Sequence, residues 1–110
     1  MKRYWEERAE TNAAWYVDTT VAWDEPDMEQ FFATGRRIVA EALDEAPPGA
    51  PLPEGRSMAV EIGSGLGRVC AALADRYDRV VGIDVAAGMV ERARQLVTTP
   101  SVAFELGDGV

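Results

Sequence analysis

Three groups of residues in this chain have the types and spacing to bind a small molecule. The first is the stretch Glu61-Ile62-Gly63-Ser64-Gly65-Leu66-Gly67, whose glycines, lacking a Cβ, tolerate unusual dihedrals and let a ligand approach the backbone. The second is Asp84, because an ionised carboxylate can accept hydrogen bonds from two adjacent ribose hydroxyls. The third is Asp108, between two glycines. A tight turn, a helix cap and a loop aspartate are the structural alternatives for the three groups.

The segments around these residues alternate between strand and helix patterns. Short apolar runs rich in β-branched residues predict strands, and apolar residues at helical spacing predict helices between them. The predicted strands are 58–62, 79–85 and 101–106, and the predicted helices are 66–76 and 86–97. This βαβαβ order predicts an α/β fold, a partial Rossmann-like doubly wound parallel sheet of about three strands.

Helices are predicted to precede that sheet. Residues 3–16 can form one helix, and residues 26–45 a second, with Asp24 as its cap. A stretch rich in proline and glycine, 47–55, then reads as an extended connector. We therefore divide the chain into an N-terminal helical lid and connector, residues 1–57, and a ligand-binding half-domain, residues 58–110.

Composition excludes several classes of function. With 110 residues, no histidine and the single cysteine Cys70, the chain has no Ser-His-Asp triad, no Cys/His zinc site and no internal disulfide, and we predict no metal. A formal net charge of −8 disfavours nucleic acid as a partner. The chain has no stretch of eighteen apolar residues and its start lacks a signal-peptide pattern, so we predict a cytoplasmic protein without a membrane span.

The glycine spacing distinguishes between cofactors. A dinucleotide fingerprint has Gly-x-Gly-x-x-Gly, but here Arg68 occupies the third glycine position and the spacing is Gly-x-Gly-x-Gly, with Glu61 two residues before it. In these residues, and in Asp84 and Asp108 downstream, the sequence resembles the class I S-adenosylmethionine-dependent methyltransferases. The resemblance covers residues 58–110 and implies S-adenosylmethionine as the cofactor.

The resemblance also implies a role for each residue of the site. Glu61 would lie near the methionine end of the cofactor, Asp84 would bind the ribose, and Asp108 would accept a hydrogen bond from the adenine amino group. The remaining residues that it implies for cofactor binding are Gly63, Ser64, Gly65, Gly67, Val85 and Met89. Core packing is an equal alternative for Met89.

The resemblance leaves the chemistry incomplete. In that family, base and substrate-binding residues come largely from segments after the fourth strand, so no catalytic residue is assigned here. We expect a methyltransferase acting on a small molecule, truncated to its cofactor-binding portion, with a bare edge at the first strand through which it could self-associate. The alternatives are a dinucleotide-binding oxidoreductase domain and a non-catalytic cofactor-binding or interaction module.

The remaining residues of chemical interest have simpler interpretations. Cys70 is expected to be a small buried apolar residue, and the arginines at 76, 79, 92 and 94 are expected to be solvated. The aromatic residues near the N-terminus either pack the helices onto the sheet or close over the cofactor. Packing is favoured for Trp5 and Trp23, whereas Trp15 and Tyr16 are weak pocket candidates.

Overall fold

A computed structural model describes residues 2–10, 27–50, 52 and 54–108 of the chain. Three strands, β1 (Met58–Ile62), β2 (Arg79–Asp84) and β3 (Val102–Leu106), form one sheet in the order β1-β2-β3. Both pairings are parallel. The βαβαβ fold and the three predicted strands are therefore confirmed, with β2 and β3 each shorter by one residue than predicted.

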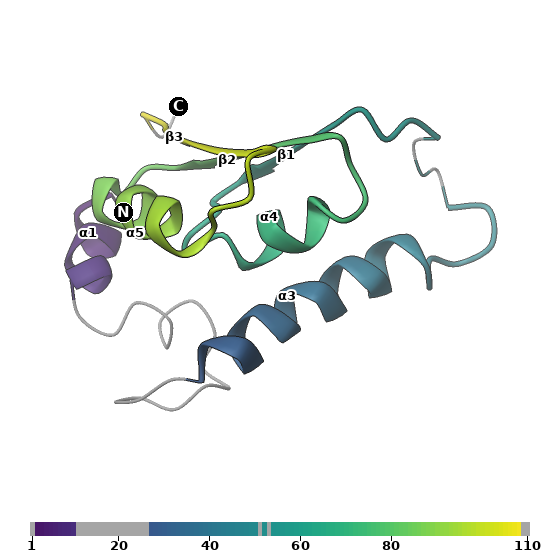
Figure 1. Ribbon diagram of the computed structural model, residues 1–110, viewed down its shortest axis with the longest axis horizontal. Coiled ribbons are helices and arrows are strands. Elements are labelled where there is room, and N and C mark those ends of the chain that lie inside the picture. The colour runs from purple at the N-terminus through teal and green to yellow at the C-terminus, as the bar shows by residue number, and fades with distance from the viewer. Residues whose placement is uncertain (1, 11–26, 51, 53, 109–110) are drawn as a thin grey trace.

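Four helices are described beside the sheet: α1 (Lys2–Glu10), α3 (Met28–Leu43), α4 (Arg68–Leu73) and α5 (Ala87–Leu96). Figure 1 shows all four on the same side of the sheet, with α3 lying beyond α4. None of these helices has the length and apolar composition needed to cross a bilayer. None of the described helices lies on the other face of the sheet (Figure 1).

The beginning of α3 differs from the prediction. Asp27 is its cap, in extended conformation, and the Asp27 side chain accepts a hydrogen bond from the Gln30 amide at 3.2 Å. An aspartate at this position satisfies one of the amides that a helix start leaves without an intrahelical acceptor. The prediction of Asp24 as the cap was therefore wrong; Asp24 itself lies outside the described residues, as do Trp15, Tyr16 and Trp23.

The core has two clusters of buried side chains, both on the helical face of the sheet. One joins the N-terminal helices to the segments around the glycine-rich stretch, and Trp5 packs against it, which confirms the packing role predicted for Trp5. Its buried members are Ala9, Phe31, Leu66, Ala86 and Met89. The other lies between the sheet and α4 and α5, and its buried members are Cys70, Val80, Val90, Ala93, Val97 and Phe104.

Helix α3 is held closely against α4 and the loop after it. Arg68 Nη1 donates to Thr34 Oγ1 at 2.6 Å. Arg76 donates to both carboxylate oxygens of Asp44, at 2.7 and 2.5 Å, and this pairing holds the pKa of Asp44 below its ordinary value. The expectation that Arg76 is merely solvated was therefore wrong, because its bidentate pair links the end of α3 to the segment before β2.

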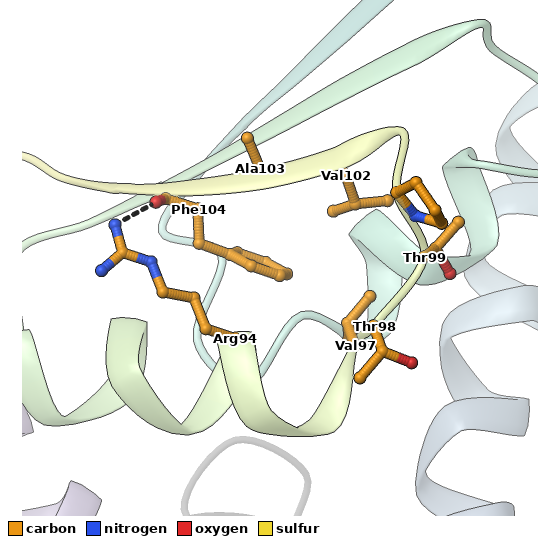
Figure 2. Close-up of a pocket in the computed structure, with 8 residues that line it drawn as sticks. Arg94, Val97, Thr98, Thr99, Val102, Ala103 and Phe104 are labelled. Carbon is orange, nitrogen blue, oxygen red and sulfur yellow. Dashed lines mark hydrogen bonds between the residues drawn. The ribbon is translucent and has the colours of Figure 1, made fainter.

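The two outer edges of the sheet differ. At β3, Arg94 Nη2 donates to the backbone carbonyl of Phe104 at 2.7 Å, so Arg94 is also more than a solvated charge (Figure 2). An open hollow beside this contact is lined by residues at the end of α5 and along β3. Within the described residues β1 pairs with β2 alone, as expected for an edge strand, and the side chains of Met58, Val60 and Ile62 are 51%, 52% and 76% exposed.

We predict that Gly35→Ala destabilises the fold, although alanine is the better helix former by about 1 kcal/mol. Gly35 is buried in α3, and a Cβ there would lie 2.3 Å from the backbone oxygen of Arg68, which cannot rotate away. Moving α3 from α4 should cost about 1–3 kcal/mol in the free energy of unfolding, measured by urea denaturation. Gly55→Ala is the control, because a Cβ there meets nothing within 4 Å. A stabilised Gly35→Ala variant would contradict this packing.

Candidate functional site

The segments that follow the three strands meet at one end of the sheet. Beyond β1, the amides of Gly63 and Ser64 both donate to the carbonyl of Ile83, at 2.7 and 3.0 Å. Beyond β3, the Gly107 amide donates to the carbonyl of Asp84 at 2.8 Å. The sequence therefore places its three predicted groups side by side, as expected for the carboxyl ends of parallel strands.

Asp84 connects the glycine-rich loop to the beginning of α5. Its Oδ2 accepts a hydrogen bond from the Gly65 amide at 2.8 Å, and its Oδ1 accepts one from the Ala86 amide at 3.0 Å. A structural role for Asp84 as a cap of the following helix would account for the bond to the Ala86 amide, but not for the bond to the Gly65 amide. Because an ionised carboxylate offers about four acceptor positions, Asp84 retains acceptors for a ligand's hydroxyls.

The three glycines of the loop share a backbone conformation, but Gly63 and Gly67 differ in their surroundings. Gly63, Gly65 and Gly67 all have positive φ angles, of 75°, 54° and 88°, in the left-handed region that disfavours other residues. A Cβ at Gly63 would meet nothing within 4 Å, so this position is open to a ligand. A Cβ at Gly67 would lie 2.6 Å from the Phe104 ring. Gly67 therefore serves close packing, and its direct contact with a cofactor stays a prediction.

The amides of this loop are largely satisfied within the protein. Those of Gly63, Ser64 and Gly65 have the acceptors described above, and the Gly67 amide donates to the Ser64 carbonyl at 2.9 Å. Loops that bind a pyrophosphate direct such amides at the phosphate oxygens instead. The arrangement thus disfavours a dinucleotide at this position.

Glu61 lies on the helical face of β1, beneath the loop. Burial raises its pKa from 4.5 to about 7, and the neighbouring charge of Asp84 acts in the same direction. The Cys70 thiol donates to Glu61 Oε1 at 3.6 Å, and this contact and the charge of Arg68 favour the ionised form. A half-buried carboxylate that is poised to lose its proton near neutral pH can pair with a cationic ligand group.

The other predicted residues lie around this centre. Val85 is half-buried and Asp108 is exposed. Met89 is only 1% exposed and belongs to the core cluster, so packing is established for it, and contact with an adenine stays a prediction. The buried Ser64 hydroxyl has no hydrogen-bond partner among the described residues. Buried polar atoms normally have a partner, so this hydroxyl is available to a ligand or a water molecule.

The contact between Cys70 and Glu61 was missed at the sequence level. Cys70 is fully buried, as predicted, but its thiol also reaches the carboxylate nine residues earlier in the chain. The order of a strand, a glycine turn and a returning helix could have indicated that these residues face each other. Within the described part of the chain, no three acidic, cysteine or histidine side chains are grouped as metal ligands.

Residues 59–109 match the model of a family described as "Methyltransferase domain". Over these residues, which include the sheet and the candidate site, the chain is similar to a methyltransferase domain. The cofactor of the family is S-adenosylmethionine.

Solved structures with the same fold extend the similarity beyond residues 59–109 to the N-terminal helices. Phosphoethanolamine N-methyltransferase 1 of Haemonchus contortus, in complex with phosphoethanolamine and S-adenosylhomocysteine, is 18% identical, with a TM-score of 0.65 over 97% of this chain. The N-methyltransferase NodS of Bradyrhizobium japonicum, in complex with S-adenosylhomocysteine, is 19% identical, with a TM-score of 0.60 over 97%. A methyltransferase of Anabaena variabilis is 21% identical, with a TM-score of 0.58 over 98%.

The chain matches only part of each of these proteins. It spans 20% of the Haemonchus protein, 47% of NodS and 37% of the Anabaena protein. At these levels of identity the structures establish a shared Rossmann-like fold. The roles of individual residues therefore have to be argued from the geometry of this chain itself.

That geometry fits S-adenosylmethionine. Carboxylates at 61, 84 and 108 suit a ligand that carries a sulfonium, an ammonium and a ribose diol. Gly63 leaves open space beside the loop. Glu61 and Asp84 would hold the cationic and ribose parts of the cofactor.

We predict that Glu61→Gln stabilises the protein above neutral pH. The pKa of Glu61 is higher in the folded state, about 7, than its ordinary value of 4.5. The folded state therefore binds more protons between these values, and stability falls as pH rises from about 4.5 to about 7. Glutamine removes this loss. After allowance for partial solvent access, it should raise the free energy of unfolding by about 1 kcal/mol at pH 8.

Urea denaturation at pH 4 and pH 8 measures this difference. The two proteins should be similar in stability at pH 4, where the carboxyl is neutral in both states. Glu105→Gln, on an exposed carboxylate of β3, is the matched control and should change little at either pH. A variant that is less stable than the original protein at pH 8 would show that Glu61 is not desolvated.

Proposed function

We propose that this protein binds S-adenosylmethionine at the loop of residues 63–67 and takes part in methyl transfer to a small molecule. The observation that supports this most is a loop whose amides are bonded within the protein, together with the nearby carboxylates of Glu61 and Asp84. Asp108 follows the end of β3, where the Gly107 amide contacts the Asp84 carbonyl. Such a site favours a cationic ligand with hydroxyl groups over a phosphate-bearing one.

The bound cofactor supplies a methyl group on a positively charged sulfur, which is already activated for transfer. The protein's main contribution is then to hold the reactants in line, which can lower a barrier by about 7–11 kcal/mol. A general base is needed only for an acceptor that arrives protonated. We assign no catalytic base, because the proposed roles of Glu61 and Asp84 are in cofactor binding.

A small-molecule acceptor agrees with the strongly acidic character of the chain, which would repel nucleic acid. The Haemonchus protein, which was solved with phosphoethanolamine, provides an example of a small ligand on this fold. Residues 1–57 are proposed to form a lid: α1 packs on the first turn of α5, where a Cβ on Gly88 would lie 2.8 Å from that of Ala9. A cytoplasmic location stays a prediction.

We predict that the full chain binds S-adenosylhomocysteine but not NAD in calorimetric titrations. Asp84→Ala should abolish this binding, because it removes the acceptors for the ribose and also releases the Gly65 amide. Glu105→Ala is the matched control, since Glu105 is an exposed carboxylate on the adjacent strand and the opposite face of the sheet.

The outcomes of these titrations separate the alternatives. Binding of NAD in preference to S-adenosylhomocysteine would favour an oxidoreductase domain. Binding of neither would favour an interaction module, and unchanged affinity in Asp84→Ala would return Asp84 to a structural role. Thermal melts without ligand verify that the variants are folded.

We further propose that the chain self-associates through β1. Antiparallel pairing of two β1 strands about Val60 would place Met58 opposite Ile62 of the other copy, on one apolar face. On the other face, Glu61 would lie opposite Ala59 of the other copy, so no like charges would be directly opposed. Such self-complementarity is what a two-fold symmetric interface requires.

Sedimentation at about 0.15 M salt, where the net charge is partly screened, should show a dimer at high protein concentration. Val60→Lys should shift it to the monomer by placing two like charges at the centre of the pairing. Ala103→Lys is the matched control, because Ala103 is exposed on the same face but lies on β3. A monomeric original chain, or a dimer equally sensitive to both substitutions, would contradict pairing through β1.

A further inference from the structure

The contact between Glu61 and Cys70 connects the candidate site with the core beneath it. The thiol donates to Glu61 Oε1 at 3.6 Å, within the range for a sulfur donor. Cys70 itself is fully buried, in the cluster with Val80 and Phe104. One polar contact thus extends from the hydrophobic core to the carboxylate that faces the site.

The donor and the acceptor in this contact are well defined. Burial and the nearby Glu61 raise the pKa of the Cys70 thiol to about 12, so the sulfur keeps its proton throughout the neutral range. It can therefore only donate to the carboxylate. The other charged groups that act on Glu61 are Arg68 of α4, which favours its ionised form, and Asp84 of β2, which opposes it.

We propose that Cys70 is a positioning residue for cofactor binding, whose thiol holds the Glu61 carboxylate in the ionised form and orientation that pair with the cationic methionine end of the ligand. This inference rests on the proposed function. Cys70 would not touch the ligand; it would act through Glu61. Its effect would therefore appear as a change in the pH dependence of binding.

The surroundings of the thiol explain why a small donor is needed at this position. A Cβ on Gly82 would lie 2.8 Å from the Cys70 sulfur. It would lie at the same distance from the Cβ of Ser64 and from the Phe104 ring. A larger polar side chain therefore has no room between α4 and β2. Alanine would fit but leave Oε1 without its donor, whereas serine would fit and keep a hydroxyl that can donate after a small shift of the Glu61 side chain.

The test compares Cys70→Ala with Cys70→Ser by calorimetric titration of S-adenosylhomocysteine between pH 5.5 and 7.5. Over this range the ligand's own amino group stays mainly protonated, and any loss of its proton near pH 7.5 affects the original chain and both variants alike. For the original chain we expect affinity to rise with pH as Glu61 ionises. Cys70→Ala should bind more weakly, by up to about ten-fold at pH 6 and by a clearly smaller factor at pH 7.5. Cys70→Ser should restore the original profile.

A purely structural role for Cys70 predicts a different result. The loss in Cys70→Ala would then be the same factor at every pH, and this result would overturn the proposal. Failure of the original chain to bind S-adenosylhomocysteine at all would instead refute the proposed function. The two failures are thus distinguishable.

A second measurement avoids substitution of the core residue. Cys70 is the chain's single cysteine, so the infrared S–H stretching band reports on it alone. The band should move to lower wavenumber as pH rises through about 7, because an ionised carboxylate is the stronger acceptor. Glu61→Gln should remove this pH dependence. A band that does not change with pH in the original chain would show that the thiol does not respond to Glu61, and would overturn the proposal.

Discussion

The carboxylate of Asp84 is the group on which the geometry of the candidate site depends. The glycine-rich loop has a backbone of positive φ angles, a conformation with little intrinsic preference to persist. The loop is held against the end of β2 by hydrogen bonds from the Gly63 and Ser64 amides to the Ile83 carbonyl. The Gly65 amide adds a third bond, to the Asp84 carboxylate. The same carboxylate accepts from the Ala86 amide, so the loop, β2 and α5 share one fixed point. A ligand would thus meet a preformed loop.

The site also contains a conflict between stability and binding. Glu61 lies where its carboxylate is partly removed from water, which a neutral side chain would tolerate better. The neighbouring thiol and Arg68 offset part of this cost, and Asp84 adds to it. Such an arrangement gains from a cation that arrives with the ligand. The position is suboptimal for the free protein, which agrees with the binding role proposed for Glu61.

The sequence was sufficient to predict the order of the strands and helices, and that the candidate residues follow strands whose ends meet at one end of the sheet. The β-branched run before Asp84 and the glycines after Glu61 are local patterns, and the parallel order follows from the connections between them. Side-chain partners on segments distant in the chain could not be predicted, because their contacts depend on how those segments approach one another. The pair of Arg76 with Asp44 spans thirty-two residues. The choice of Asp27 over Asp24 as the cap depended on where α3 begins, which periodicity places only to within a few residues.

The hydrogen bond from the Arg94 guanidinium to the Phe104 carbonyl affects which edge of the sheet can pair with another copy. It occupies a backbone acceptor on the outer side of β3 and so makes this side a poor template for another strand. In the described sheet, β1 is then the better edge for growth. Pairing of two β1 strands would use this edge in both copies and close the assembly under two-fold symmetry. An end-to-end stack of sheets, the first step toward a fibre, would need the edge that Arg94 obstructs.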